Sequence, residues 1–319
     1  MHPSSPVNEK NPTFNFPILF NKCLNKIILI VAIDLERYKK IYGFIPSRQQ
    51  EGWSLRTNTL KISVENLEAR LSKYGSVKRM QFVNEGFFVN TDKNLSKSIE
   101  HSLGYFFLQN ASSMIPPLIL DPKPTDTILD MCAAPGSKTT EIAALMQNQG
   151  PIVANDITYK RLKALRGNLQ RCGVMNVVVT KMFGENFWKI KEKFNKILLD
   201  TPCTGTGSMN PRILQQTSEQ SIRYLSRLQK RLLESAAQCL EEDGTLIYST
   251  CSLEPEENEE NIDFAVRQLG LRTERVQLKL NYMPGLSKWN DKQFEQTFNA
   301  VRIIPTNEME GFFICKLKK

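Results

Sequence analysis

Apolar and polar positions along the chain change their pattern near residue 127. From Thr127 onward, short apolar runs alternate with amphipathic stretches, which is typical of a doubly wound sheet of parallel strands. The apolar runs predict strands at residues 128–131, 152–155, 176–180, 196–200, 245–250, 301–304 and 312–317. The helical spacing predicts helices at residues 138–147, 159–172, 219–241 and 256–269. We therefore expect an α/β domain in this part.

The first part of the chain has a different pattern. Its spacing predicts helices over 35–42 and 64–74 and strands over 53–60, 77–83 and 86–89, a small α+β module with one free sheet face. A free face suits contact with single-stranded nucleic acid, and a plain packing subdomain fits equally well. We predict an irregular lead-in over 1–26, the module over 27–121 and the α/β domain over 122–319.

Charge and apolar content narrow the classes of partner. The formal charge is +9 at pH 7, and residues 156–196 hold ten Lys or Arg against three Asp or Glu. Such an excess of positive charge favours a polyanionic binding partner, although runs of charged residues are also common on the solvent-exposed faces of helices. The apolar run 27–33 is far shorter than the roughly 20 residues that span a bilayer, so we expect no membrane contact.

Cysteine and histidine usage points to free thiols and no metal. The seven cysteines form no C-x-x-C pair and follow no secretory leader, which indicates the reducing cytoplasm. The two histidines, His2 and His101, have no regular Cys or Asp cluster beside them. A zinc site is therefore not expected.

Two cysteines follow two of the predicted buried strands. Cys203 lies in Asp-Thr-Pro-Cys after strand 196–200, and Cys251 lies in Ser-Thr-Cys-Ser after strand 245–250. Open α/β sheets bind ligands at the carboxyl ends of their strands, so two thiols delivered there favour nucleophilic catalysis on a bound molecule. Spacing and strand position alone do not decide which thiol attacks.

A further motif joins the first predicted strand to the first helix, from Asp130 to Thr139. Its small residues let the backbone approach a ligand, and the helix N-terminus stabilises negative charge. Asp156 follows 20 residues after Gly136, a spacing at which nucleotide-binding folds place an acid on ribose hydroxyls. A nucleoside-containing cofactor is implied. The fingerprint G-x-G-x-x-G is missing, which makes NAD the weaker candidate.

Taken together, these motifs resemble the sun-type RNA (cytosine-5) methyltransferases, which use S-adenosylmethionine, and among them the archaeal-type tRNA enzymes. The resemblance covers about residues 50–319, and its most specific segments are 130–138, 200–207 and 248–252 with 256–258. Segments 56–61 and 109–113 resemble the family's N-terminal landmarks. The resemblance implies a Rossmann-like S-adenosylmethionine-dependent methyltransferase domain with a smaller N-terminal α+β RNA-binding module.

The resemblance also implies roles for single residues. Cys251 matches the family nucleophile, Cys203 the cysteine that helps to release product, and Asp200 an acid beside the cytosine ring and the methyl donor. The cofactor site would comprise Cys132, Ala133, Ala134, Pro135, Gly136, Ser137, Lys138, Asp156, Arg161, Gly184 and Asp200. The family often has Asp-Gly where this chain has Phe183-Gly184, so stacking by Phe183 or a backbone group would replace the acid's contact with adenine.

The chemistry of cytosine methylation explains these residue types. A thiolate that adds to C6 activates C5, and Lys138, a helix N-terminus or the cationic cofactor could lower the thiol pKa. The polar segment 208–216 is predicted to be a mobile loop that orders on RNA. We expect a cytoplasmic monomer acting on RNA, with tRNA favoured over rRNA. A non-catalytic RNA-binding assembly factor and a nicotinamide oxidoreductase are the alternatives.

Overall fold

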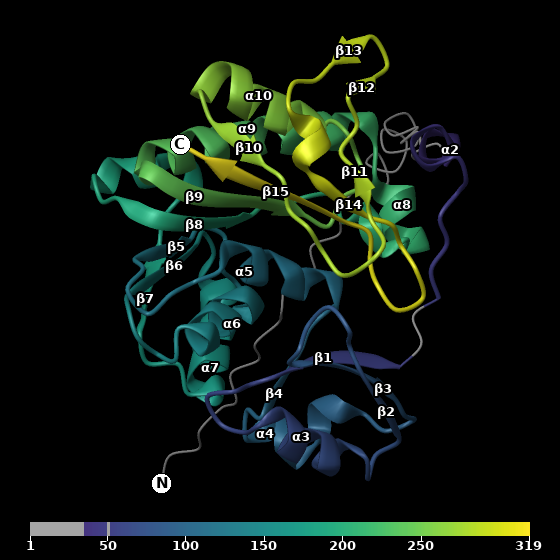
Figure 1. Cartoon of the computed structure of the whole chain (residues 1–319), viewed down its shortest axis with the longest axis vertical. Helices are drawn as coiled ribbons and strands as arrows, with labels where there is room; N and C mark the ends of the chain where they lie inside the picture. The colour runs from purple at the N-terminus through teal and green to yellow at the C-terminus, as the bar shows by residue number, and fades with distance from the viewer. Residues whose placement is uncertain (1–34, 50–51) are drawn as a thin grey trace, which may run out of the picture.

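The computed structural model describes residues 35–49 and 52–319, which form two sheets in contact with each other (Figure 1). The lead-in predicted over 1–26 and the apolar run 27–33 lie outside the described residues. Within the described part, no helix combines the length and the apolar character needed to cross a membrane.

The smaller sheet is antiparallel, with the strand order β2-β3-β1-β4. Its strands are β1 (Trp53–Thr57), β2 (Ser76–Arg79), β3 (Gly86–Asn90) and β4 (Phe106–Leu108). Helix α3 (Val64–Leu71) begins after the N-cap residue Ser63 and packs Leu67 against Leu55 and Phe87 of the sheet. The short helix α4 (Ile99–Ser102) precedes β4.

The opposite face of this sheet is not free, so the expectation of an open nucleic-acid platform is wrong. Arg56 on that face is 3% exposed. Its Nη2 donates to the Ser137 carbonyl (3.2 Å) and to the Thr140 hydroxyl (3.0 Å) of the larger unit. Phe88 on the same face packs into a core cluster of the larger sheet. The face is covered because its polar and aromatic side chains meet partners that are distant in sequence.

The larger sheet has nine strands, in the order β11-β14-β15-β9-β8-β5-β6-β7 with β10 paired to β15. Its parallel strands are β5 (Ile128–Asp130), β6 (Ile152–Asp156), β7 (Val177–Lys181), β8 (Phe194–Asp200) and β9 (Leu240–Thr250). Antiparallel pairing adds β10 (Arg272–Glu274), β11 (Met283–Pro284), β14 (Val301–Ile303) and β15 (Phe312–Lys318). A separate hairpin is formed by β12 (Lys288–Trp289) and β13 (Lys292–Gln293).

Helices cover both faces of the larger sheet, which confirms the predicted doubly wound α/β architecture (Figure 1). One side carries α5 (Ile115–Leu120), α6 (Ser137–Leu145) and α7 (Tyr159–Cys172), and the other carries α9 (Glu219–Cys239) and α10 (Glu259–Leu269). On β8, Ile197 and Leu199 belong to one core cluster and Leu198 to the other. Because both faces of the sheet are buried there, residues 197–199 of this strand form a continuous apolar run.

Helix α2 (Glu36–Tyr42) packs on the larger unit although it precedes the smaller sheet in sequence. The Tyr38 hydroxyl donates to Glu254 Oε1 (2.7 Å). Arg302 donates to the Tyr42 hydroxyl (3.0 Å) and is itself buried. The segment before the small sheet is thus anchored beside the turn that follows β9.

Some elements differ from the sequence-based prediction. Segment 208–216, expected to be a loop, contains helix α8 (Pro211–Gln216), which Asn210 caps. An Asn cap followed by proline is a helix-start signal that the polar composition obscured. The helix predicted from 256 begins at Glu259. Single 3-10 turns lie at Leu95–Lys97, Ser112–Met114, Gly184–Ile190, Thr206–Ser208 and Thr297–Asn299.

Candidate active site

Two thiols meet where the neighbouring parallel strands β8 and β9 end. Cys203 follows the last residue of β8 by three positions, and Cys251 follows β9 directly. Their Sγ atoms lie 3.1 Å apart, and both side chains are half-buried. The register of the strands, in which Asp200 pairs with Ser249, brings the two motifs to one point. The structure therefore unites the two cysteines that the sequence singled out.

The surroundings of Cys203 hold its proton on the sulfur. The pKa of Cys203 is raised well above its usual value, first by the hydrogen bond with Cys251, then by burial and by the nearby charge of Glu257. Lys138, which the sequence suggested as a group that lowers a thiol pKa, places its ammonium on Asp200. Cys251 is among the charges that raise the pKa of Lys138, so the ammonium also acts on a Cys251 thiolate.

Asp200 is the acid at the end of β8, and it is held from two sides. Lys138 Nζ donates to its Oδ2 (2.7 Å), and the Ser249 hydroxyl donates to its Oδ1 (2.7 Å). Lys138 also donates to the Ser113 hydroxyl (2.7 Å). Burial alone would lower the pKa of Lys138, but the charge and hydrogen bond of Asp200, together with the charges of Cys251 and Asp130, outweigh this effect and the pKa is raised. The carboxylate is therefore fixed beside the thiol loops.

The loop after β5 has the geometry of a ligand-binding turn. Gly136 has a φ of +102°, and a Cβ there would lie 2.7 Å from Leu165, so only glycine fits. The Ala134–Pro135 peptide bond is cis. The Ala134 N–H donates to Asp156 Oδ2 (3.2 Å), and Arg161 donates to the Ala134 carbonyl (2.7 Å). Asp156 and Arg161, which also pair with each other at 3.3 Å, thus hold this loop in place.

A cavity of about 180 Å³ opens between this loop, the end of β6 and helix α9. Its lining brings together several of the predicted cofactor residues, Cys132, Asp156, Arg161 and Gly184, with Pro202 next to the Cys203 loop. The other predicted cofactor residues, which are 133–138 and Asp200, do not line this cavity. The cavity is further lined by Met131, Asn155, Ile157, Met182, Phe183, Glu185, Tyr224, Leu228, Arg231 and Leu232. Gly184 is required for packing, since a Cβ would meet Leu232 at 2.5 Å.

Sequence reasoning missed several polar residues of the site. Ser113 and Ser249, which orient Lys138 and Asp200, lay inside recognised motifs but carried no chemistry that would single them out. Glu257 contacts Thr204 in the Cys203 loop and Ser252 in the Cys251 loop, and Gln229 contacts Pro202 and Glu257. The position of Glu257 shortly after the Cys251 motif is only a weak sequence signal for such contacts. No sequence signal singled out Gln229.

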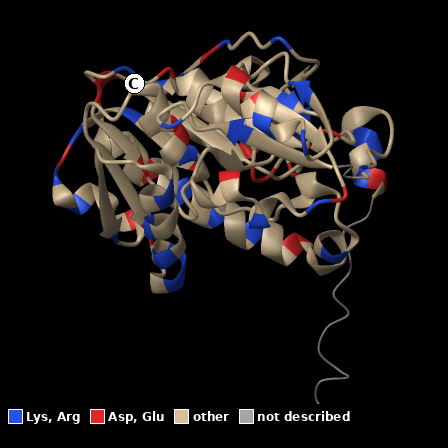
Figure 2. Ribbon diagram, turned by 90° about the horizontal axis from the view of Figure 1, so that it is seen from below, with Lys and Arg blue, Asp and Glu red and all other residues tan. Residues whose placement is uncertain are grey.

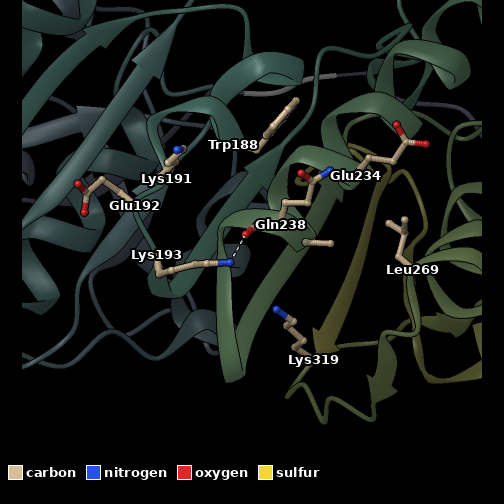
Figure 3. A pocket seen from close by; sticks show the side chains of 9 residues that line it. Trp188, Lys191, Glu192, Lys193, Glu234, Gln238, Leu269 and Lys319 are labelled. Atoms are coloured by element: carbon tan, nitrogen blue, oxygen red, sulfur yellow. Dashed lines mark hydrogen bonds between the residues drawn. The ribbon is translucent and has the colours of Figure 1, made fainter.

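A second cavity lies at the opposite end of the strands (Figure 3). It has a volume of about 680 Å³, and Lys193 donates there to the Gln238 carbonyl (2.5 Å). Lys193 precedes β8 and Lys319 follows β15, so this hollow lies at the amino ends of β8 and β9, away from the thiols. No group of His, Cys, Asp and Glu in residues 35–49 and 52–319 is arranged to hold a metal.

Comparison with known proteins agrees with this geometry. The family model described as 16S rRNA methyltransferase RsmB/F matches residues 117–318. The chain belongs to the RsmB/F methyltransferase family. A model described as the N-terminal domain of 16S rRNA methyltransferase RsmF matches residues 35–111 of this RsmB/F chain.

Individual relatives cover most of this RsmB/F chain. It is 38% identical to the tRNA (cytosine(49)-C(5))-methyltransferase of Pyrococcus abyssi, over 89% of this chain and 95% of that protein. It is also 38% identical to ribosomal RNA small subunit methyltransferase F of Cronobacter sakazakii, over 83% of this chain and 56% of that protein. NSun6 from Pyrococcus horikoshii with SFG matches with a TM-score of 0.77 at 25% identity, over 89% of this chain and 97% of that one. The resemblance inferred from the motifs is confirmed.

The cofactor of this RsmB/F methyltransferase is S-adenosylmethionine. The residues of the cavity fit it. Asp156 and Arg161 provide charge at one wall, while Leu228 and Leu232 provide an apolar wall. Phe183 is 56% exposed at the rim, where a ring can stack on a base.

Proposed function

We propose that this chain is an RNA (cytosine-5) methyltransferase that transfers the methyl group of S-adenosylmethionine to C5 of a cytosine, with tRNA as the favoured substrate. One observation carries the proposal: the Cys203 and Cys251 sulfurs are 3.1 Å apart beside the fixed Asp200. A protein that only binds RNA has no need for such a pair. A nicotinamide oxidoreductase is disfavoured because the loop after β5 lacks the G-x-G-x-x-G fingerprint.

In this proposal Cys251 is the nucleophile. Its thiolate adds to cytosine C6, which breaks the C5–C6 double bond and makes C5 an enamine carbon. Bound S-adenosylmethionine supplies an electrophilic methyl group on a sulfonium centre. Asp200 would stabilise the charge that develops at N3 by sharing a proton with that atom, which requires the acid form of its carboxyl group. The target base must leave its stack to reach the half-buried sulfur.

Cys203 acts in the release of product. Once C5 is methylated, a base takes the C5 proton, the electrons of that C–H bond re-form the C5–C6 double bond, and Cys251 Sγ leaves C6 as a thiolate, which restores the aromatic ring. Cys203 Sγ, at 3.1 Å from the departing sulfur, is near enough to assist this elimination. Asp156 would bind the ribose hydroxyls of the cofactor, with Arg161 in support, and the loop 132–138 would bind its methionine part.

The preference for tRNA over rRNA rests on how much of each relative's length this chain matches, and the expectation of an RNA partner rests on the chain's positive charge. The tRNA-modifying relative is matched over 95% of its length and the rRNA-modifying relative over 56%, which supports tRNA. The family model's description keeps rRNA as the second candidate. Helix α7 contains five Lys or Arg and no Asp or Glu. Figure 2 shows basic residues spread over the molecule as seen from below, with acidic residues between them. We also propose a cytoplasmic monomer, since free thiols suit a reducing compartment.

Two cysteine variants test this proposal with S-adenosylmethionine and tRNA transcripts. Cys251→Ala should abolish methylation and retain cofactor binding. Cys203→Ala should accumulate an enzyme–RNA adduct that survives denaturant. If instead Cys251→Ala traps the adduct and Cys203→Ala turns over, the two roles are reversed. Bisulfite sequencing of tRNA and rRNA identifies the cytosine, and a wild-type enzyme that leaves all of them unmodified would contradict the proposal.

A further inference from the structure

We propose that Glu257 is the positioning residue that holds the two thiol loops against each other. Its carboxylate accepts the N–H (3.1 Å) and the hydroxyl (2.5 Å) of Thr204, the residue after Cys203. The same carboxylate accepts the hydroxyl of Ser252 (2.7 Å), the residue after Cys251. One buried side chain therefore joins the flanks of both sulfurs. The inference rests on the proposed function, because it concerns the same two thiols.

Gln229 of α9 extends this contact to the other flank of Cys203. Its Nε2 donates to Glu257 Oε2 (2.8 Å) and to the carbonyl of Pro202 (2.9 Å). Its Oε1 accepts from Asn261 (2.8 Å), so the orientation of the amide is determined. The residues before and after Cys203 are thus tied to the same carboxylate. Gln229 belongs to helix α9, and a residue on a helix is held more precisely than one on a loop, which suits a fixed separation of the two sulfurs.

The chemistry of the cluster requires a carboxylate. Glu257 is 0% exposed, and its hydrogen-bond donors are neutral Thr, Ser, Gln and backbone groups. Within the described part of the chain it forms no ion pair with Lys or Arg. A carboxylate offers acceptor sites on both oxygens for these donors, whereas an amide accepts on one atom and points a donor at the others. Burying an acid costs free energy, and the hydrogen bonds that Glu257 accepts from these donors offset that cost.

Glu254 offers a matched control three positions earlier. It is also 0% exposed and lies in the same turn, but its side chain contacts Tyr38 (2.7 Å) and Arg37 (2.9 Å) of α2. Its partners do not flank either sulfur. Glu254→Gln therefore makes the same chemical change at the same depth without loosening the contact between the thiol loops.

The first measurement follows the thiols without RNA. Diamide takes two electrons and two protons from Cys203 and Cys251, which form a disulfide while the diazene becomes a hydrazine. Peptide mass spectrometry of the full chain gives the rate for this pair. Glu257→Gln should slow the reaction about tenfold or more, and Glu254→Gln should stay within about twofold of wild type. Ser252→Ala removes the hydroxyl that contacts Glu257 (2.7 Å), Thr204 (3.0 Å) and the Glu254 N–H (3.1 Å) but leaves the contacts of Glu257 with Thr204 and Gln229, so it should give an intermediate rate even if Glu257→Gln does not fold.

The second measurement is methyl transfer with saturating S-adenosylmethionine and tRNA transcript. Glu257→Gln should lower kcat about 100-fold while KM for RNA changes less than about threefold, with kcat calculated per active site counted by cofactor titration, so that a smaller folded fraction does not mimic the loss. Thermal melting checks that each variant is folded. Equal disulfide rates in Glu257→Gln and Glu254→Gln, or an unchanged rate in Ser252→Ala, would overturn the positioning role. If the disulfide rates differ as expected but wild type methylates no RNA, the proposed function fails and the positioning role stands.

Discussion

Lys138 Nζ lies 2.7 Å from Asp200 Oδ2, so a cation from the cofactor loop is fixed on the acid that ends β8. Lys138 is 7% exposed, and the pair links the turn after β5 with the strand end beside the thiols. Such a buried pair is costly to break from one side, because the remaining charge is left without its partner. The two halves of the candidate site, for cofactor and for base, are thereby coupled.

Removing this cation should slow the reaction. We expect Lys138→Met to lower kcat about 100-fold with little change in RNA binding, because Asp200 loses the group that orients it. Single-turnover methylation and cofactor titration measure the effect. Lys123→Met is the control, since Lys123 pairs with Asp121 (2.6 Å) at the surface and should leave the rate unchanged. A wild-type rate in Lys138→Met would contradict the role of the pair.

Gly207 is the point where three loops approach most closely. Its N–H donates to the Cys251 carbonyl (2.9 Å), and its carbonyl accepts from the Gly311 N–H (2.8 Å). A Cβ at this position would lie 2.0 Å from the Gly311 oxygen and 2.8 Å from the Cys251 oxygen. Gly207→Ala should therefore lower the free energy of unfolding by about 2 to 4 kcal/mol, because backbone must move.

The control for this substitution is Gly167→Ala in helix α7. A Cβ at Gly167 has nothing within 4 Å, so the variant should be stabilised by up to about 1 kcal/mol through helix propensity. Urea unfolding of both variants measures the difference. A Gly207→Ala protein as stable as wild type would show that the three loops can separate at no cost.

Asp130, at the end of β5, should make stability depend on pH. Burial raises its pKa from the usual 3.8 to about 7, although the Thr139 hydroxyl opposes this. A group whose folded pKa exceeds its unfolded value contributes stability below the unfolded pKa, and that stability is lost as pH rises through the folded pKa. This contribution to the free energy of unfolding should fall between about pH 4 and pH 7, by on the order of 3 kcal/mol.

Asp130→Asn removes this titration and keeps an acceptor for Thr139. Urea unfolding at pH 5 and pH 7.5 should show a smaller difference in the variant than in wild type. Asp92→Asn, at an exposed position, is the control and should behave as wild type does. An unchanged pH dependence in Asp130→Asn would assign the effect to other buried acids.

Arg56 should determine how firmly the small sheet is attached. Its Nε lies 3.4 Å from Glu141 Oε2, and both side chains are 3% exposed. Arg56→Ala leaves Glu141 buried without its cation and should lower stability by about 3 to 5 kcal/mol. Arg79→Ala removes the exposed pair with Glu68 (2.6 Å) and should cost less than about 1 kcal/mol. Thermal melting compares the two, and equal losses would contradict the proposed attachment.

The spacing of apolar residues predicted those helices and strands in which buried and exposed positions recur regularly. Helix α7 was predicted over 159–172 and has these bounds, because its apolar positions recur at helical spacing and Gly173 follows as a left-handed C-cap. Strands β5, β6 and β8 were predicted from their apolar runs, since burial on both faces of the sheet favours apolar side chains at successive positions. The short β4 and helix α5, with Pro116 and Pro117, carried no such signal. The predicted domain limits and residue roles stay predictions.

The sequence by itself determined which reactive side chains reach the carboxyl edge of the sheet. Asp200, Cys203 and Cys251 each lie at or just after the end of an apolar run, and this placement can be read from the local sequence. Only the tertiary structure decided that the sulfurs stand 3.1 Å apart, that Lys138 binds Asp200, and that the small sheet has no free face. Periodicity reports how often a position is buried. It does not report which distant side chain fills the space beside it, because that depends on strand register and on packing between segments far apart in the chain.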